Sequence, residues 1–442
     1  MHKLICLKCQ YYRQGCSGLV TALLALTLST LSQAVTAYDI NGFTLSGDIR
    51  TGWVQYDYDN PDGDPNINKG HQDSKGFYVV PKLSLTTPSY KGFSGKITAA
   101  GATDFGLNNE EDESRNFVFD PDDRESFTIL QELYLQWQTD QQQALVGRKE
   151  FVSPMIEADD YYMLANSFAM GVYDNRYFTN TSIKVGYFAE MAGVWDSGAN
   201  GTKFRSMSDA SFVPQVNKDE ADDKGVYFAA VDYDNELHRL QVWNYYADEL
   251  YNTFFSQYDY VNDNNQFNYN IGLQFINFSE VGKLKSSSTE IDYSLYSIKF
   301  DGAFDNGITF ASGASKYSNG EGTEETLGAW GGFPYFANGM IFHFFEAGSL
   351  RNAESYKLQA GYDFTTRAAD KLSIALRYTR FELDPEYSIS SDGRGQDLMH
   401  MAGVRVNYKF LRNGYFTGTF EQHSVDHEPD VWALRLIGGF TF

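Results

Sequence analysis

The chain has 442 residues, a formal net charge of −23 at pH 7 and 16% aromatic residues. This acidic balance argues against nucleic acid as a partner, because phosphate binding needs a basic surface. The aromatic and hydrophobic content is too high for a disordered chain. The same composition continues from Tyr38 to Phe442 without a linker, which indicates one large domain.

The N-terminus has the features of an export signal. Basic residues precede an apolar stretch from Leu19 to Leu31, and Val35-Thr36-Ala37 forms a small-residue cleavage site. All three cysteines lie before this site. We therefore predict a signal peptide over residues 1–37 and a mature domain over residues 38–442.

Short stretches of alternating apolar and polar residues recur along the mature chain. In the last of them, Trp432, Leu434 and Leu436 alternate with Ala433 and Arg435. Stretches of roughly 9 to 11 residues with this pattern are typical of strands that cross a bilayer, and such strands must close into a barrel. We expect an all-β fold, a transmembrane antiparallel β-barrel of about 18 strands, with about 16 as the alternative.

The connections between these stretches alternate between short and long. The long ones include residues 150–180 and 318–354. Residues 150–180 show no barrel alternation, are too apolar to remain in water and cannot face lipid with an irregular backbone. We therefore expect this extracellular loop to fold into the lumen and form a constriction. Its pore-facing residues are predicted to be Asp159, Asp160, Tyr161, Tyr162 and Arg176.

Basic residues fall on the polar face of many predicted strands. They are Arg50, Lys82, Lys96, Arg148, Lys184, Arg239, Lys299, Lys357, Arg377, Arg405 and Arg435. A row of cationic side chains along a pore favours anions by direct electrostatics. The alternative is that each residue pairs with a neighbouring carboxylate across the wall. The set as a whole predicts a positively lined passage.

No pattern in the sequence indicates an enzyme. The nucleophile elbow Gly-x-Ser-x-Gly does not occur, and the histidines have no partner at a characteristic spacing. No cofactor or metal site is expected. Acidic runs in the predicted long loops favour a solvated surface, with a divalent-cation bridge to lipopolysaccharide as the alternative.

Two groups of motifs carry a resemblance to a known family. The first comprises Gly147-Arg148-Lys149, Pro154, Asp159-Asp160 and Gly171, and the second runs from Ala329 to Pro334 and continues at Gly361-Tyr362-Asp363-Phe364. Together they resemble the OprD family of substrate-specific outer-membrane porins. The resemblance implies an 18-stranded barrel, a monomer or loose trimer, with an eyelet of inward loops and a basic ladder for carboxylate-bearing solutes. Arg148 is the residue that best matches the family's pattern.

We therefore expect a passive, substrate-selective channel in the outer membrane of a Gram-negative bacterium. Its solutes would be small carboxylates such as amino acids and organic acids, its surroundings lipid and lipopolysaccharide, and its state a monomer or homotrimer. One alternative is an oligosaccharide channel in which aromatic rings stack on sugars. Those rings would be Tyr161, Tyr162, Tyr173, Trp330, Phe333, Tyr335 and Phe336. A structural or adhesive barrel is a further alternative.

Overall fold

The computed structural model describes twelve stretches of the chain. They are residues 37–59, 73–108, 126–159, 163–193, 203–210, 224–263, 266–286, 290–322, 326–342, 347–365, 371–410 and 413–442. The predicted signal peptide lies outside them except for Ala37, and so do Asp160, Tyr161 and Tyr162 of the predicted constriction.

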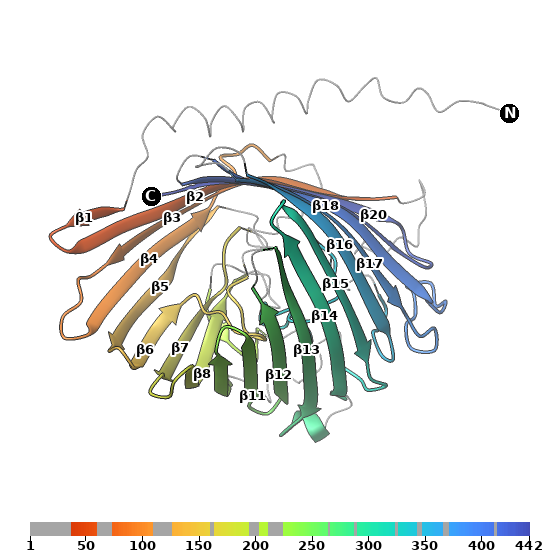
Figure 1. Ribbon diagram of the computed structural model, residues 1–442, viewed down its shortest axis with the longest axis horizontal. Coiled ribbons are helices and arrows are strands. Elements are labelled where there is room, and N and C mark those ends of the chain that lie inside the picture. Colours follow the sequence, from red (N-terminus) through yellow and green to blue (C-terminus); the bar gives the residue numbers. More distant parts are fainter. Residues whose placement is uncertain are drawn as a thin grey trace.

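Eighteen antiparallel strands follow one another in chain order around a closed barrel (Figure 1). They are β2 (Phe43–Tyr58), β3 (Ser74–Thr86), β4 (Phe93–Ala102), β5 (Phe127–Gln138), β6 (Gln142–Lys149), β7 (Ser167–Asn175), β8 (Thr181–Ala192), β10 (Val226–Asp234), β11 (His238–Ala247), β12 (Tyr251–Asn262), β13 (Phe267–Glu280), β14 (Asp292–Phe304), β15 (Ile308–Tyr317), β16 (Glu354–Thr365), β17 (Lys371–Glu382), β18 (Leu398–Phe410), β19 (Gly414–Val425) and β20 (Val431–Thr441). This confirms the predicted fold class and strand number.

The ring closes where the first long strand meets the last one. β2 pairs with β20 from Asp48 opposite Thr441 to Tyr58 opposite Val431. Phe442 extends this pairing, because its amide and carbonyl each form a 2.9 Å hydrogen bond with Gly47. A closed ring leaves no strand edge with unpaired backbone groups, which a bilayer would not tolerate.

Three short elements complete the fold. β1 (Tyr38–Ile40) pairs with β2, and β9 (Arg205–Ser206) pairs with β8. The short 3-10 helix η1 (Leu284–Ser286) follows β13. Among the described residues, no helix is long and apolar enough to cross a bilayer.

Side chains alternate between the outer face and the lumen along each strand, as the sequence predicted. On β14, Tyr296 and Ile298 are 54% and 50% exposed on the outer face. Ser297 and Lys299 lie on the other face, where Lys299 contacts Phe336 from inside the barrel. Large apolar side chains are exposed on the outer face of most strands. An apolar belt of this extent suits hydrocarbon better than water.

Short turns and long connections lie at opposite ends of the barrel. Residues 139–141, 176–180, 235–237 and 305–307 join strands at one end. Residues 150–166, 193–225, 318–353 and 383–397 join strands at the other end. The predicted alternation holds for these connections but not around the whole ring, because residues 248–250 form a short connection between β11 and β12 at the end with the long ones.

The predicted loop over residues 150–180 is wrong in its extent. β7 (Ser167–Asn175) lies within this range and crosses the barrel wall. Arg176 directly follows β7, at the end with the short turns, and its guanidinium lies 2.7 Å from the Asp174 carboxylate. Arg176 is thus far along the strand from the inward loop and does not belong to a constriction there.

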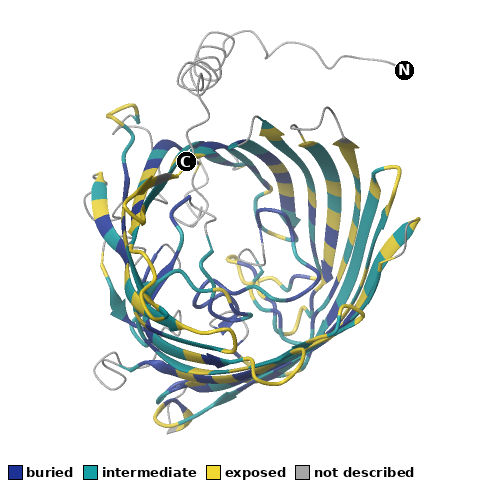
Figure 2. Ribbon diagram, turned by 60° about the vertical axis from the view of Figure 1, so that its left-hand side comes forward, coloured by how far each residue is buried: buried dark blue, intermediate teal, exposed yellow. Residues whose placement is uncertain are grey.

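Two chain segments fold inside the ring (Figure 2). We define the first inward segment as residues 150–159 and 163–166, and the second as residues 326–342. Met155, Ile156 and Trp330 from these segments are buried in one cluster with wall residues such as Phe188 and Trp243. The lumen at this level is therefore partly filled by packed protein.

Candidate functional site

The two inward segments are joined to each other. Ile156 forms backbone bridges with Trp330 and Gly331, and the Glu157 amide donates a 3.1 Å hydrogen bond to the Trp330 carbonyl. The Trp330 side chain is only 2% exposed. Its ring stacks on Tyr251 at 5.4 Å, and its indole N–H donates to the Met207 carbonyl. The joint is therefore a fixed part of the constriction.

Glycine is required at this joint. Gly331 has a φ of +85°, and a Cβ there would lie 2.5 Å from the Asn166 amide nitrogen and 2.6 Å from the Glu157 carbonyl oxygen. A Cβ on Gly332 would lie 2.4 Å from the main chain of Met155. Only glycine allows the two backbones to approach this closely.

The second inward segment crosses the wall strands at one level. The Gln274 amide on β13 donates to the Pro334 carbonyl at 2.8 Å. Gly313 on β15 lies against the backbone of Phe336, and a Cβ there would be 3.0 Å from its carbonyl oxygen. Thr379 on β17 donates to the Asn338 carbonyl at 2.8 Å. The segment therefore runs around the inside of the wall from β13 towards β19.

A buried carboxylate fixes the far end of this segment. Glu421 on β19 is 0% exposed and accepts three main-chain hydrogen bonds. The amides of Met340, Ile341 and Phe342 donate to its oxygens at 2.6, 2.6 and 2.8 Å. Hydrogen bonds to a charged acceptor are stronger than neutral ones, so Glu421 is the principal anchor here.

Two predicted pore-lining arginines bind the same stretch. Arg377 donates to the Gly339 carbonyl at 2.7 Å and to the Gln359 amide oxygen at 2.9 Å. Arg405 donates to the Met340 carbonyl at 2.6 Å. Part of the hydrogen-bonding capacity of both guanidinium groups is therefore used to hold the second inward segment.

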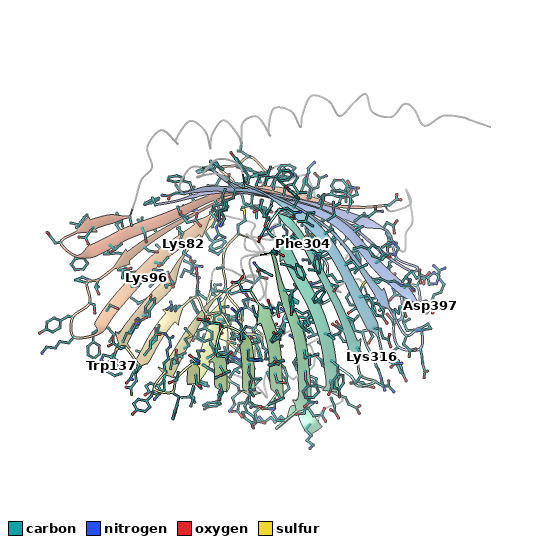
Figure 3. The ribbon with its side chains drawn as sticks, viewed as in Figure 1. Lys82, Lys96, Trp137, Phe304, Lys316 and Asp397 are labelled. Carbon is teal, nitrogen blue, oxygen red and sulfur yellow. The ribbon has the colours of Figure 1, made fainter. Side chains whose placement is uncertain are left out.

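The first inward segment is attached to strands near the N-terminus. The Gln131 amide on β5 donates to the Ala165 carbonyl at 2.9 Å. Lys82 on β3 forms an ion pair with Glu150, and Arg50 on β2 donates to the Met163 carbonyl at 3.4 Å. Figure 3 labels Lys82 together with Lys96, which lies on the neighbouring strand β4.

We call β2–β11 the N-terminal wall; most of the predicted basic residues on it lie against carboxylates. The pairs are Arg50 with Asp48 at 2.7 Å, Lys82 with Glu150, Lys96 with Glu132 at 2.5 Å, Lys184 with Asp232, and Arg239 with Asp234 at 3.1 Å. On β14, Lys299 pairs with Asp259 at 3.1 Å. Along the N-terminal wall, and at Lys299 on β14, the pairing alternative is the one that the geometry favours.

We call β15–β20 the C-terminal wall; its predicted basic residues are arranged differently. Lys357 forms no hydrogen bond or ion pair within the described part of the chain, and Arg377 and Arg405 bind main-chain carbonyls. In register, Arg405 on β18 lies opposite Thr419 on β19, which in turn lies opposite Arg435 on β20. These cations form an arc along neighbouring strands.

Arg148 does not lie in the lumen network in the way that alternation predicted. In register, Arg148 lies opposite Leu133, which is exposed on the outer face, and Val146 two residues earlier is exposed there too. The Arg148 guanidinium lies 4.1 Å from the centre of the Phe204 ring. It is Lys149 that lies over the lumen-facing Tyr134 ring, at 4.8 Å.

Four of the seven aromatic residues proposed to stack on sugars are placed away from the open lumen, while Tyr161 and Tyr162 lie outside the described residues. Trp330, Tyr335 and Phe336 are all buried, and Tyr173 lies on the outer face of β7. Burial raises the pKa of the Tyr335 phenol well above its usual value.

Asp159 of the predicted constriction accepts a main-chain hydrogen bond, which the Asn166 amide donates to its carbonyl. Within the described residues, no group of three metal-ligating side chains is present.

Solved structures with the same fold are porins. Pseudomonas aeruginosa OccK9 (OpdG) superposes with a TM-score of 0.74 at 13% identity, over 91% of this chain and 99% of that one. The BenF-like porin from Pseudomonas fluorescens Pf-5 gives 0.70 at 13% identity, over 91% and 100%. Pseudomonas aeruginosa OpdK, determined with vanillate, gives 0.69 at 14% identity, over 90% and 98%.

Comparison by sequence adds no further relative. No protein-family model matches the chain, and no curated protein matches it. The structural neighbours agree with the OprD family resemblance that the motifs carry. The chain therefore has the fold of the OprD-type porins.

Proposed function

We propose that this protein is an outer-membrane porin for the passive, selective diffusion of small carboxylate-bearing solutes. The observation that carries the proposal is the lumen itself. A closed barrel is narrowed by two joined inward segments, and the wall beside them presents Lys357, which forms no ion pair within the described residues although the Asp301 carboxylate acts on it from a greater distance. Arg435 and Arg405 extend the cationic surface along that wall.

Electrostatics supplies the selectivity. Exposed charges act over about 8 Å at physiological ionic strength, and a lumen surrounded by protein screens them less than open water does. An anionic solute therefore gains attraction along the C-terminal wall, whereas the paired cations of the N-terminal wall contribute little net field. Solute binding must stay weak enough for release. Diffusion down a concentration gradient needs no cofactor or energy source.

The porin neighbours support this reading. The OpdK structure was determined with vanillate, which is a carboxylate. The apolar outer face of the present barrel suits a bilayer, and the proposed location is the outer membrane, among lipid and lipopolysaccharide. We infer export by the signal peptide at residues 1–37 and a monomer or homotrimer as the working state.

Uptake into proteoliposomes tests the proposal. Purified protein should admit succinate faster than a neutral sugar alcohol of similar size, such as erythritol. Equal rates for both solutes would contradict selectivity for carboxylates. Negligible uptake of both would favour a structural or adhesive barrel. N-terminal sequencing of the membrane-extracted protein should start at Tyr38, and a retained apolar segment would contradict the proposed processing.

A further inference from the structure

A shallow groove runs along the outer face of β15. Gly313 lies against Phe336 inside the barrel, so its neighbours Ser312 and Ala314 face outward. Both side chains are small, whereas the outward side chains directly opposite them on the neighbouring strands are large. These are Ile298 and Phe300 on β14, and Tyr356 and Leu358 on β16. The result is a depression of about 490 Å³ in the barrel surface.

The groove presents an apolar surface to its surroundings. Leu358 on its rim is 65% exposed. The Ser312 hydroxyl donates a 3.0 Å hydrogen bond to the Phe300 carbonyl, so its proton is used within the wall. Lys299 and Lys357 also border the space, but at positions whose side chains face the lumen. Such a depression suits a hydrocarbon chain, because an unfilled gap loses packing contacts.

The position of the groove along the wall selects one leaflet of the bilayer. The outward row of β16 runs from Tyr356 at one end to Phe364 at the other, and the groove borders Tyr356. Lys316 follows Ala314 by two residues on the same face of β15. Figure 3 labels Lys316 towards the end with the long connections and Phe304 towards the end with the short turns. The long connections are the predicted extracellular ones, so the groove faces the outer leaflet.

Two cations lie on the outer face where the groove ends. Lys316 pairs with Glu354 at 3.2 Å, and Arg380 on β17 pairs with Glu382 at 3.1 Å. Arg380 is next to Tyr356 in register, and the four charged side chains are 41–49% exposed. Exposed ion pairs are weak, and a phosphate offers more charge and more acceptor oxygens than one carboxylate. An acyl chain that ends at a phosphate therefore matches this line of groove and cations.

A second copy of the barrel matches the surface less well. Another barrel packed on the groove would also cover the two ion pairs, and the desolvation of buried charges is costly. A lipid keeps its head group at the wet interface while one flexible chain fills the groove. Within hydrocarbon the gain comes from close packing rather than from the hydrophobic effect.

We propose that this groove is a binding site for lipopolysaccharide. One acyl chain of its lipid A part lies over Ser312 and Ala314, and a lipid A phosphate lies at Lys316 and Arg380. The inference rests on the proposed function, since it takes the outer membrane as the location of the porin. It adds a defined lipid site on the outside of the wall, separate from the path of the solute.

Filling the groove tests the site most directly. Ala314→Leu places a branched side chain where the acyl chain would lie. Binding of purified lipid A to the detergent-solubilised protein is measured by native mass spectrometry, with EDTA present so that no divalent cation links the lipid to acidic loops. We expect the Kd of the first bound lipid A to rise about five-fold through lost packing contact. Ala402→Leu is the matched control, because Ala402 is an exposed alanine on the outer face of β18. Its Kd should equal that of the unmodified protein.

A charge variant tests the head-group end and does not depend on the fit of a larger side chain. Lys316→Gln should also raise the Kd of lipid A about five-fold, as for one basic residue near an anionic lipid. Lys224→Gln removes a cation from another exposed pair, with Asp248, beside β10 and should leave the Kd unchanged. Phosphatidylglycerol is the comparison lipid and should bind more weakly than lipid A.

The outcomes separate this proposal from the porin function. Succinate uptake by Ala314→Leu should equal that of the unmodified protein, because the groove lies outside the lumen. If the unmodified protein admits no succinate, the porin function fails whatever lipid A does. If uptake is normal and the Kd stays constant in Ala314→Leu and Lys316→Gln, the lipid site alone is overturned. Equal binding of phosphatidylglycerol, or a change from oligomer to monomer in Ala314→Leu with unchanged lipid A binding, would also overturn it.

Discussion

On the N-terminal wall Arg50, Lys96 and Lys184 each lie against a carboxylate, whereas on the C-terminal wall Arg377 and Arg405 bind main-chain carbonyls. A carboxylate cancels the charge of its partner, but a carbonyl only orients it. The described contacts of these two arginines on the C-terminal wall therefore hold the second inward segment, although the Glu421 carboxylate on the same wall also acts on Arg377. The comparison teaches that a row of basic residues in a sequence does not by itself give a charged surface, because the partner of each residue decides the net field.

Removing the Trp330 side chain should loosen the joint between the two inward segments. Trp330→Ala deletes a buried ring that contacts Tyr251 and donates to the Met207 carbonyl. We expect a loss of about 3–5 kcal/mol in the free energy of unfolding, together with a larger single-channel conductance. Thermal unfolding and planar-bilayer recording measure these effects. Trp137→Ala, on the outer face of β5 (Figure 3), is the control and should leave conductance unchanged.

Releasing the second inward segment from the C-terminal wall is a narrower test. Glu421→Gln replaces an acceptor of three main-chain amides with a group that has one acceptor and one donor. We expect a loss of about 3 kcal/mol in unfolding free energy and a noisier, larger conductance. Glu382→Gln removes a charge from the same half of the molecule at an exposed position paired with Arg380. Unchanged conductance in Glu421→Gln would show that other contacts hold the segment.

The contrast in charge pairing can be measured with two lysines. Lys357→Gln removes a cation without a described partner, and we expect anion over cation permeability to fall about five-fold, as for about 1 kcal/mol of lost attraction. Lys96→Gln leaves Glu132 buried without its cation, so its main effect should be on stability. Reversal potentials in a salt gradient measure the first effect and thermal unfolding the second. Equal reversal potentials for Lys357→Gln and the unmodified protein would place the selective charge elsewhere.

The smallest effect is expected at the exposed end of the C-terminal wall. Arg394 donates a 2.7 Å hydrogen bond to Asp392 and holds the pKa of that carboxyl below its ordinary 3.8. A lowered pKa in the folded state stabilises the protein above pH 3.8, and this contribution disappears as the pH falls further. Asp392→Asn should therefore unfold at a slightly lower temperature than the unmodified protein at neutral pH. The difference should vanish in strong acid, and a difference that persists there would contradict the assignment.

The barrel could be predicted because alternation is a local signal. Tyr296 and Ile298 on one side of β14, with Ser297 and Lys299 on the other, show the period of two directly in the sequence. β7 carried no such signal. Its lumen-facing Phe168 packs on Phe188, under the first inward segment, so both faces of the strand are apolar.

The constriction was less accessible to prediction than the wall. Arg148 lies two residues after the outward-facing Val146 and opposite the outward-facing Leu133, so the alternation places Lys149, and not Arg148, on the lumen face. Glu421 reads in the sequence like any polar residue on a lumen face, although it binds three amides that are about 80 residues away along the chain. Such contacts between a loop backbone and a distant strand leave no local pattern.

The attachment of the second inward segment uses its main chain almost throughout. Gln274, Thr379 and Arg405 bind carbonyls, and Glu421 binds amides. Backbone groups are the same whichever side chains the segment carries. Residues held through their carbonyls, such as Pro334, can therefore be changed while the hydrogen bonds that attach the segment to the wall are kept. In this protein, side chains of the constriction can be engineered while the attachment of the second inward segment to the wall is preserved.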